Sequence, residues 1–256
     1  MSEINKLIYE SKDVVDVYAL DDRLQPAERN IVDILKSRLS AMRMLDIGIG
    51  AGRTTSYFIS LVKHYVGIDY AQNMIRSCQE RFANSAAAFK VCDVRDMKIF
   101  SDESFDFVLF SYNGIDYMPH EERIKAFREI KRVLALKGVF CFSTHNTQYI
   151  SRFYKITLCK SPMRFCQVLK IYWQVRSLLK QYGSFDKIPY AIINDGGEEF
   201  RAQTHYIAPQ LQIKQLHQIG FKTIRVFSEN SGGEIQDHNL LNGMTSDRWF
   251  YFLCTN

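Results

Sequence analysis

The stretch from residue 44 to residue 53 reads Met44-Leu45-Asp46-Ile47-Gly48-Ile49-Gly50-Ala51-Gly52-Arg53. A short apolar run ends in an acid and then in three glycines at alternate positions, and a segment of helical character follows. Glycine has no Cβ, so a glycine-rich turn lets the backbone come close to a ligand. Open α/β sheets bind ligands outside the carboxyl ends of their strands, where this turn is expected to lie. The stretch therefore predicts a site for a nucleoside cofactor.

The spacing of the glycines indicates which cofactor. Dinucleotide-binding turns have the spacing G-x-G-x-x-G and hold a pyrophosphate at a helix N-terminus, whereas Gly48, Gly50 and Gly52 alternate. This spacing disfavours a nicotinamide oxidoreductase. Asp46 would repel a pyrophosphate but suits a ligand that carries a cationic ammonium group. The pattern resembles motif I of the class I S-adenosylmethionine-dependent methyltransferases.

Three further strand ends support the resemblance. Asp69 closes the apolar run Val66-Gly67-Ile68, 21 residues after Gly48, and an acid at this place can accept hydrogen bonds from ribose hydroxyls. An acid also follows the next expected strand, and the run from Phe105 to Asn113 resembles motif IV. Asp is a preferred N-cap as well, so helix capping is the structural alternative for the two acids.

The resemblance implies the cofactor contacts residue by residue. Tyr70 and Met74 would pack near the adenosine, Asp93 would accept from the adenine amino group, and the backbone of Val94 would lie beside the ring. The complete expected cofactor site, with S-adenosylmethionine as cofactor and S-adenosylhomocysteine as product, consists of Asp46, Gly48, Gly50, Gly52, Asp69, Tyr70, Met74, Asp93, Val94, Ser111, Tyr112 and Asn113.

Strand-like and helix-like segments alternate from 43 to 146, which predicts a parallel sheet with helical crossovers. With the resemblance, the expected fold is α/β: a Rossmann-like, seven-stranded, mostly parallel sheet with helices on both faces and an antiparallel last strand. We expect an N-terminal helical cap over 1–42, a core over 43–146 and 205–256, and a helical lid insertion over 147–204 whose long helix runs from Ile150 to Leu179. Tyr18 and Arg23 of the cap are further candidate contacts with the cofactor.

Composition narrows the class of protein. With 256 residues, 46% of them hydrophobic, the chain is long enough for one domain with a sizeable core. No apolar run has the length of a membrane span and no signal peptide is recognisable, so a cytoplasmic location is expected. The six cysteines form no C-x-x-C pair and no cluster with zinc spacing, so neither disulfides nor a metal site are expected.

The insertion carries the positive charge of the chain. Its only acid between 147 and 190 is Asp186, while its bases are Arg152, Lys155, Lys160, Arg164, Lys170, Arg176, Lys180 and Lys187. Three interpretations stay open: a solvated helix face, a funnel for an anionic small substrate, or contact with nucleic acid or an anionic membrane surface. No RNA-binding module accompanies the bases, so this third interpretation, nucleic acid or membrane surface, is the least favoured of the three.

Methyl transfer from a sulfonium requires the acceptor atom to be held in line, and a hydroxyl acceptor also needs a general base. His145, at the end of the fifth expected strand, is the first candidate because histidine titrates near neutrality. His205 and Tyr206, at the exit of the insertion, are the others. Pro is absent after Asn113, unlike in the enzymes that methylate amino groups of nucleic-acid bases.

The predicted function is therefore methyl transfer to an oxygen or nitrogen of a small metabolite, with an anionic acceptor among the alternatives. Two other functions stay open: an RNA or protein methyltransferase that docks through the basic insertion, and a non-catalytic protein that binds S-adenosylmethionine. The sequence leaves the oligomeric state open.

Overall fold

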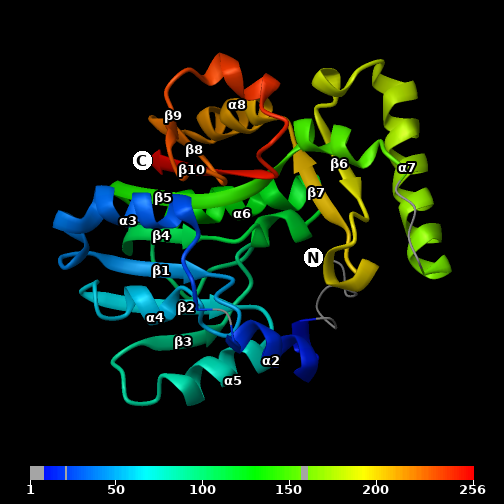
Figure 1. Ribbon diagram of the computed structural model, residues 1–256. Coiled ribbons are helices and arrows are strands. Elements are labelled where there is room, and N and C mark those ends of the chain that lie inside the picture. The colour runs from blue at the N-terminus through cyan, green and yellow to red at the C-terminus, as the bar shows by residue number, and fades with distance from the viewer. Residues whose placement is uncertain (1–8, 21, 157–160) are drawn as a thin grey trace.

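A single sheet forms the centre of the molecule (Figure 1). The computed structural model describes residues 9–20, 22–156 and 161–256, and within these the sheet has ten strands. Eight strands follow one another in the order β3-β2-β1-β4-β5-β10-β8-β9. Their bounds are β1 (Arg43–Ile47), β2 (His64–Asp69), β3 (Ala88–Val91), β4 (Phe105–Phe110), β5 (Leu134–Asn146), β8 (Ile224–Ser228), β9 (Glu234–Ile235) and β10 (Trp249–Thr255).

The pairing of the strands confirms the expected topology. β1 pairs in parallel with β2 and β4, β2 with β3, and β4 with β5. β10 runs antiparallel to both of its neighbours, β5 and β8. All five parallel strands therefore present their carboxyl ends at the same edge of the sheet.

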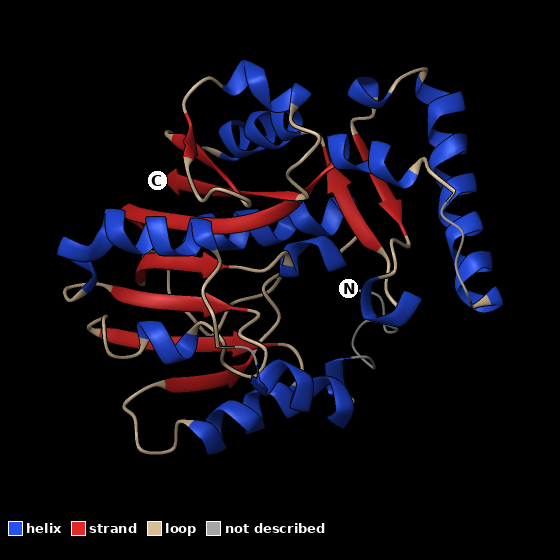
Figure 2. Cartoon of the chain, viewed as in Figure 1, coloured by secondary structure: helices blue, strands red, loops and turns tan. Residues whose placement is uncertain are grey.

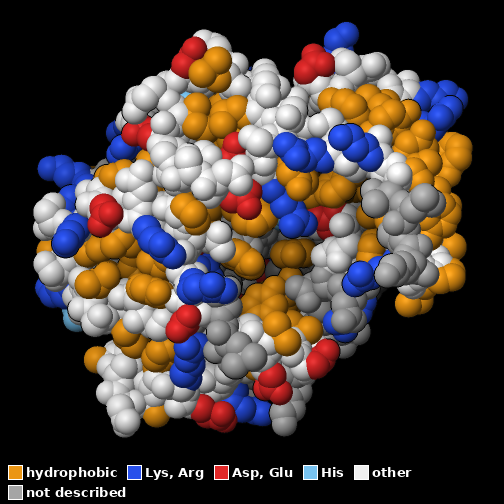
Figure 3. Space-filling view, viewed as in Figure 1, with side chains coloured by type: hydrophobic (Ala, Val, Ile, Leu, Met, Phe, Trp, Pro, Cys, Tyr) orange, Lys and Arg blue, Asp and Glu red, His pale blue; other side chains and the backbone are white. Residues whose placement is uncertain are grey.

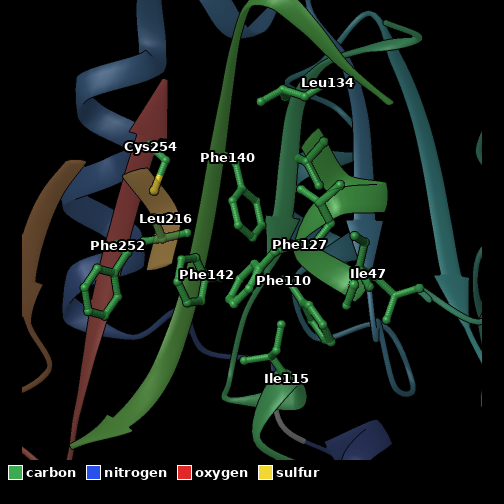
Figure 4. Packing of buried hydrophobic residues seen from close by; sticks show 14 of the residues in the cluster. Ile47, Phe110, Ile115, Phe127, Leu134, Phe140, Phe142, Leu216, Phe252 and Cys254 are labelled. Carbon is green, nitrogen blue, oxygen red and sulfur yellow. The ribbon is translucent and has the colours of Figure 1, made fainter. Parts of the chain in front are cut away.

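Helices cover both faces of this sheet (Figure 2). Alternate residues of a strand point to opposite faces, so Val108 and Phe110 of β4 pack with α6 (His120–Val133) and α8 (Pro209–Ile219), as Figure 4 shows for part of this cluster. Phe107 and Leu109 point to the other face and pack with α3 (Pro26–Leu39) and α4 (Thr55–Phe58). The helices on both faces confirm the predicted fold class.

The N-terminal cap is attached through a side chain. α2 (Lys12–Leu20) lies against α5 (Gln72–Arg81). Just before α2, the Glu10 carboxylate accepts hydrogen bonds from the backbone N–H groups of Gln72 (2.8 Å) and Asn73 (3.1 Å). A carboxylate is favourable at a helix N-terminus, where N–H groups lack partners. This contact holds α2 beside the carboxyl end of β2.

The insertion differs from the predicted all-helical lid. It contains η2 (Thr147–Phe153), α7 (Pro162–Tyr182), η3 (Phe185–Lys187) and η4 (Gly197–Phe200), but also β6 (Tyr190–Ile193) and β7 (Thr204–Ile207). β7 pairs in parallel with the last residues of β5, and β6 pairs antiparallel with β7. These two strands and β9 raise the strand number from the predicted seven to ten.

Two differences, the strands β6 and β7 and the division of the expected long helix, have a visible physical reason. In β6, exposed Ile192 lies between buried Ala191 and Ile193, which is the period of two of a half-buried strand. The expected helix from Ile150 to Leu179 is divided because Pro162 begins α7, with Ser161 as its N-cap. None of the described helices is long and apolar enough to cross a membrane.

Candidate functional site

The glycine turn follows β1 and bends back toward β2. Gly48 has φ +63° and its N–H donates to the carbonyl of Ile68 over 2.8 Å. A Cβ at Gly48 would also come within 2.9 Å of the Phe110 ring, so both the conformation and the space require glycine here. Gly50 faces a cavity, whereas Gly52 packs against Phe82 and does not line it.

Asp69 connects the turn to the end of β2. Its carboxylate accepts from the N–H of Gly50 (3.0 Å, Oδ2) and from the N–H of Ala71 (2.9 Å, Oδ1). Burial raises the pKa of Asp69 to about 6, so the group is largely ionised at pH 7. An ionised carboxylate can accept about four hydrogen bonds. The backbone of Gly50, Ala71 and Tyr70 uses part of this capacity, and the rest is left for a ligand in the cavity that Asp69 lines.

The cavity lies outside the carboxyl ends of β1, β2 and β4 and has a volume of about 700 Å³, its open mouth included. The space-filling view shows a hollow in the middle of the face that is turned to the reader (Figure 3). Pockets for small ligands and cofactors have volumes of roughly 300–1,000 Å³. The predicted cofactor residues that line the cavity are Gly48, Gly50, Asp69, Tyr70, Met74, Asp93, Val94, Ser111 and Tyr112.

A second hollow of about 760 Å³ shares Gly48, Gly50, Ser111 and Tyr112 with the cavity and adds Asp46 and Arg53. The Asp46 carboxylate accepts from Thr54 Oγ1 (2.6 Å) and Tyr65 OH (2.7 Å), both at Oδ2. Burial raises the pKa of Asp46 to about 6. Two hydrogen bonds therefore fix Asp46 in the second hollow, whereas Asp93 lines the first; the two hollows together are called the groove below.

Arg53 and Glu28 form a buried ion pair below this second hollow. The two guanidinium nitrogens Nη1 and Nη2 donate to the two Glu28 oxygens over 2.7 and 2.6 Å. Glu28 also accepts from Ser111 Oγ and from Tyr251 OH. The pair therefore joins α3, the glycine turn and the loop after β4 in one network.

The loop after β4 has an unusual backbone. Tyr112 and Asn113 both have positive φ, +55° and +62°, which side-chain-bearing residues rarely adopt and which concentrates at functional sites. The N–H of Asn113 donates to Ser143 Oγ (2.8 Å), and its side-chain Oδ1 is buried with no hydrogen-bond partner among the described residues. Asn113 does not line either hollow, whereas the Tyr112 ring does, with Arg53 5.0 Å above it.

Asp93 differs in its surroundings from the other acids of the groove. Partial burial opposes ionisation, but hydrogen bonds and the charge of Arg95 lower the pKa of Asp93 overall. Arg95 Nε lies 2.9 and 3.1 Å from the two carboxylate oxygens, and Arg95 also bonds Glu122 over 3.0 Å. Any ligand would therefore share Asp93 with Arg95. The adenine contact stays a prediction.

Four tyrosines form one wall of the cavity. The ring of Tyr9 lies edge-on to those of Tyr117 (centroid distance 5.6 Å), Tyr18 (6.0 Å) and Tyr70 (6.2 Å). They come from the N-terminal cap, from α2, from the end of β2 and from η1 (Gly114–Tyr117). Tyr18 was an expected contact, and Arg23, the other one, is exposed but accepts at its carbonyl from Arg53.

None of the three catalytic candidates lines either hollow. His145 Nδ1 is 2.7 Å from Asp116 Oδ2, and Asp116 also pairs with buried Arg123 and accepts from Thr144 Oγ1 (2.6 Å). The His145 ring contacts the Trp249 ring (5.6 Å), which in turn contacts Tyr112 (6.1 Å). Contacts through the rings of Trp249 and Tyr112 thus connect His145 with the cavity.

His205 and Tyr206 face different partners. His205 Nε2 lies 2.9 Å from His120 Nδ1 in a buried stack with Tyr190, and burial and the charge of Arg123 lower the pKa of His205. Tyr206 OH, next to the His145 ring, donates to Asp195 Oδ2 over 2.6 Å. The structure brings His145 and Tyr206 together and places His205 apart from both hollows.

Sequence reasoning missed several residues that shape this site. Arg53 directly follows the glycine turn, and Glu28 stands three residues after Gln25 at the start of α3, a capping box that can be read from sequence. Nothing in the sequence indicates Tyr9, because its ring contacts Tyr70 and Tyr117, far along the chain, and no motif marks Asp195. Asp195 accepts from Thr204, Tyr206 and the N–H of Gly197.

Comparisons with known proteins agree with this geometry. Residues 44–138 match the protein family described as "Methyltransferase domain". The "Uncharacterized methyltransferase YcgJ" of Bacillus subtilis (strain 168) is 31% identical over 106 residues, 40% of this chain and 40% of that protein. The matches span less than half the length of the curated relatives.

Solved structures resemble the whole chain. An S-adenosylmethionine dependent methyltransferase from Mesorhizobium loti has a TM-score of 0.60 at 13% identity, over 90% of this chain and 98% of that one. The 1,6-didemethyltoxoflavin-N1-methyltransferase of Burkholderia thailandensis, solved with bound 1,6-didemethyltoxoflavin and S-adenosylhomocysteine, has a TM-score of 0.59 at 13% identity, over 99% and 86%. At such identities the likeness establishes the fold. Residues 44–138 therefore match a methyltransferase domain, and the fold of the chain is that of S-adenosylmethionine-dependent methyltransferases of class I.

Proposed function

We propose that the chain transfers a methyl group from S-adenosylmethionine to an oxygen or nitrogen atom of a small molecule. The observation that carries this proposal is the groove at the carboxyl ends of β1, β2 and β4, where Asp69 and Asp46 are fixed on either side of the glycine turn. A ligand with a ribose at one end and a cationic ammonium at the other matches these two acids in sign and in order along the groove.

The residues of the groove fit such a cofactor group by group. Asp69 retains hydrogen-bonding capacity for the ribose after its bonds to the backbone. Asp46 keeps Oδ1 for the ammonium group, since both of its described bonds end at Oδ2. Val94 and Met74 supply apolar surface for the adenine, beside the Asp93 carboxylate.

The protein's part in the chemistry is orientation and proton removal. S-adenosylmethionine supplies, when bound, a methyl group that is already activated by the positive sulfonium. We assign the base to His145 and the positioning of its ring to Asp116. Because Asp116 lies at Nδ1, the tautomer with a proton on Nδ1 leaves the lone pair on Nε2. Arg123 compensates the charge of Asp116, and Nε2 of His145 would accept the proton of the acceptor.

The acceptor would lie between the loop after β4 and the insertion. β6 and β7 extend the sheet beyond the carboxyl end of β4, because β7 pairs with the part of β5 that β4 does not reach (Figure 1). Arg152, near the end of η2, and Arg248, just before β10, lie on this side, which favours an anionic acceptor. The likeness to the Burkholderia enzyme, which was solved with bound 1,6-didemethyltoxoflavin, supports a small molecule as acceptor.

The test is transfer of a radiolabelled methyl group from S-adenosylmethionine to extracts separated by size. We expect label in the small-molecule fraction with wild type and not with His145→Gln. Label that appears only in the RNA or protein fraction would contradict the small-molecule acceptor. Cofactor binding without transfer to any fraction would contradict the enzymatic function and favour a non-catalytic binding protein.

A further inference from the structure

The long helix α7 has two faces of different character. Ile171 and Val175 are buried and pack with Ile150, Ile188 and other residues of the insertion. The opposite side consists of residues spaced three and four apart, which places them along one line of the helix. This outer stripe comprises Met163, Cys166, Lys170, Trp173, Ser177 and Lys180, all of them exposed.

The outer stripe is not an ordinary solvated helix face. Met163 is 72% exposed and Trp173 is 60% exposed, the two highest values among the large hydrophobic residues of α7. In Figure 3, hydrophobic side chains gather along the edge of the molecule that α7 forms. Isolated exposed hydrophobic residues are normal on protein surfaces, but Met163 and Trp173 share one face of α7 with exposed bases, a combination typical of helices that lie at a membrane interface.

Charge on the same helix is of one sign. Arg164, Lys170, Arg176 and Lys180 are all exposed, and no acid occurs in α7. The Arg176 guanidinium lies 5.3 Å from the centre of the Trp173 ring, which keeps a cation beside the most exposed aromatic group. From Met163 to Lys180 this surface extends for about 25 Å at 1.5 Å per residue.

We propose that the outer stripe of α7 docks the protein on an anionic lipid surface. Tryptophan and methionine can enter the boundary between headgroups and acyl chains, while lysine and arginine extend to the phosphates. A second copy of the chain fits less well, because a two-fold contact would bring the same basic helix against itself with no acid of α7 to pair with the bases. Nucleic acid would complement the charge but would leave Met163 unburied. The proposal goes beyond methyl transfer and does not depend on it.

The experiment is co-sedimentation of the full chain with vesicles of phosphatidylcholine alone or mixed with phosphatidylglycerol. We expect binding to the anionic vesicles only, together with quenching of tryptophan fluorescence by brominated lipid in wild type but not in Trp173→Phe. Neutralising three bases, in Arg164→Gln/Lys170→Gln/Lys180→Gln, should weaken binding at least tenfold, since each base near an anionic surface contributes about fivefold. Met163→Gln should weaken it as well.

A matched variant separates this surface from the net charge of the chain. Arg29→Gln/Lys36→Gln/Lys98→Gln removes three exposed bases elsewhere and should leave vesicle binding unchanged. Equal weakening by both triple variants would overturn the proposal, as would equal binding to neutral vesicles. A dimer that Trp173→Gln dissociates, seen by light scattering without lipid, would assign the surface to a second copy instead. Retention on RNA without vesicle binding would assign it to nucleic acid.

Discussion

Removal of one partner of the ion pair between Glu28 and Arg53 should be strongly destabilising. The two side chains are 1% and 10% exposed, and two hydrogen bonds of 2.6 and 2.7 Å join them. Glu28→Gln removes the anion and leaves the guanidinium buried without its partner. Breaking one side of a buried pair costs about 3–5 kcal/mol, which is a large part of a typical total of roughly 5–15 kcal/mol.

The assay is urea unfolding followed by circular dichroism, with thermal unfolding as a second measurement. At about 2–4 °C per kcal/mol for a domain of this size, Tm should fall by about 10 °C. The double variant Glu28→Gln/Arg53→Met should be less destabilised than the sum of the two single variants, because it leaves no unpaired charge. A cost below about 1 kcal/mol for Glu28→Gln, the value of an exposed pair, would refute the reasoning.

Two further predictions concern the histidines. His145→Gln should lower kcat by about 10²- to 10⁴-fold, as expected for loss of a general base, and should leave the affinity for S-adenosylhomocysteine unchanged. The control His64→Gln, at an exposed histidine, should change neither quantity. A kcat of His145→Gln equal to that of wild type would show that His145 is not the base. Burial and the charge of Arg123 lower the pKa values of His120 and His205. The unfolded chain therefore binds more protons, and these histidines reduce stability as pH falls below about 6.5. Asp46 and Asp69, with raised pKa values of about 6, act in the opposite direction. The free energy of unfolding is therefore compared between wild type and His205→Gln. Between pH 7 and pH 5 it should fall less in His205→Gln than in wild type, and parallel pH profiles of the two proteins would contradict this prediction.

The sequence predicts the core of the fold because strong local signals mark its strand ends. The glycine turn, Asp69 and the run up to Ser111 are each recognisable in the sequence, and the cavity assembles nine of the twelve predicted cofactor residues. Parallel strands bring their ends to one edge of the sheet, so order along the chain translates into proximity.

The insertion was less predictable for a physical reason. β6 and β7 are four residues each, and they become strands by pairing with each other and with the end of β5. Such pairing is set by partners distant in the sequence rather than by local propensity. The same holds for Glu28, whose partners Arg53, Ser111 and Tyr251 lie far along the chain.

Gly52 and Asn113 illustrate the limit of motif reasoning. Both occupy positions of recognised motifs, but Gly52 serves the packing against Phe82, and Asn113 shapes the loop through Ser143. A motif predicts the backbone conformation more reliably than it predicts which of its residues contact a ligand. The turn requires glycine or a positive φ at some positions even where no ligand is near.

The most direct test of the account is isothermal titration of S-adenosylhomocysteine into wild type, Asp69→Asn and a control, Asp96→Asn. Asp96 is an exposed acid that pairs with Lys98, away from the groove. We predict that wild type and Asp96→Asn bind alike and that Asp69→Asn, still folded by circular dichroism, binds at least tenfold more weakly, because hydrogen bonds to a charged group contribute about 1.5–3 kcal/mol. Absence of binding to folded wild type, or equal binding by all three proteins, would contradict the assignment of the groove to this cofactor.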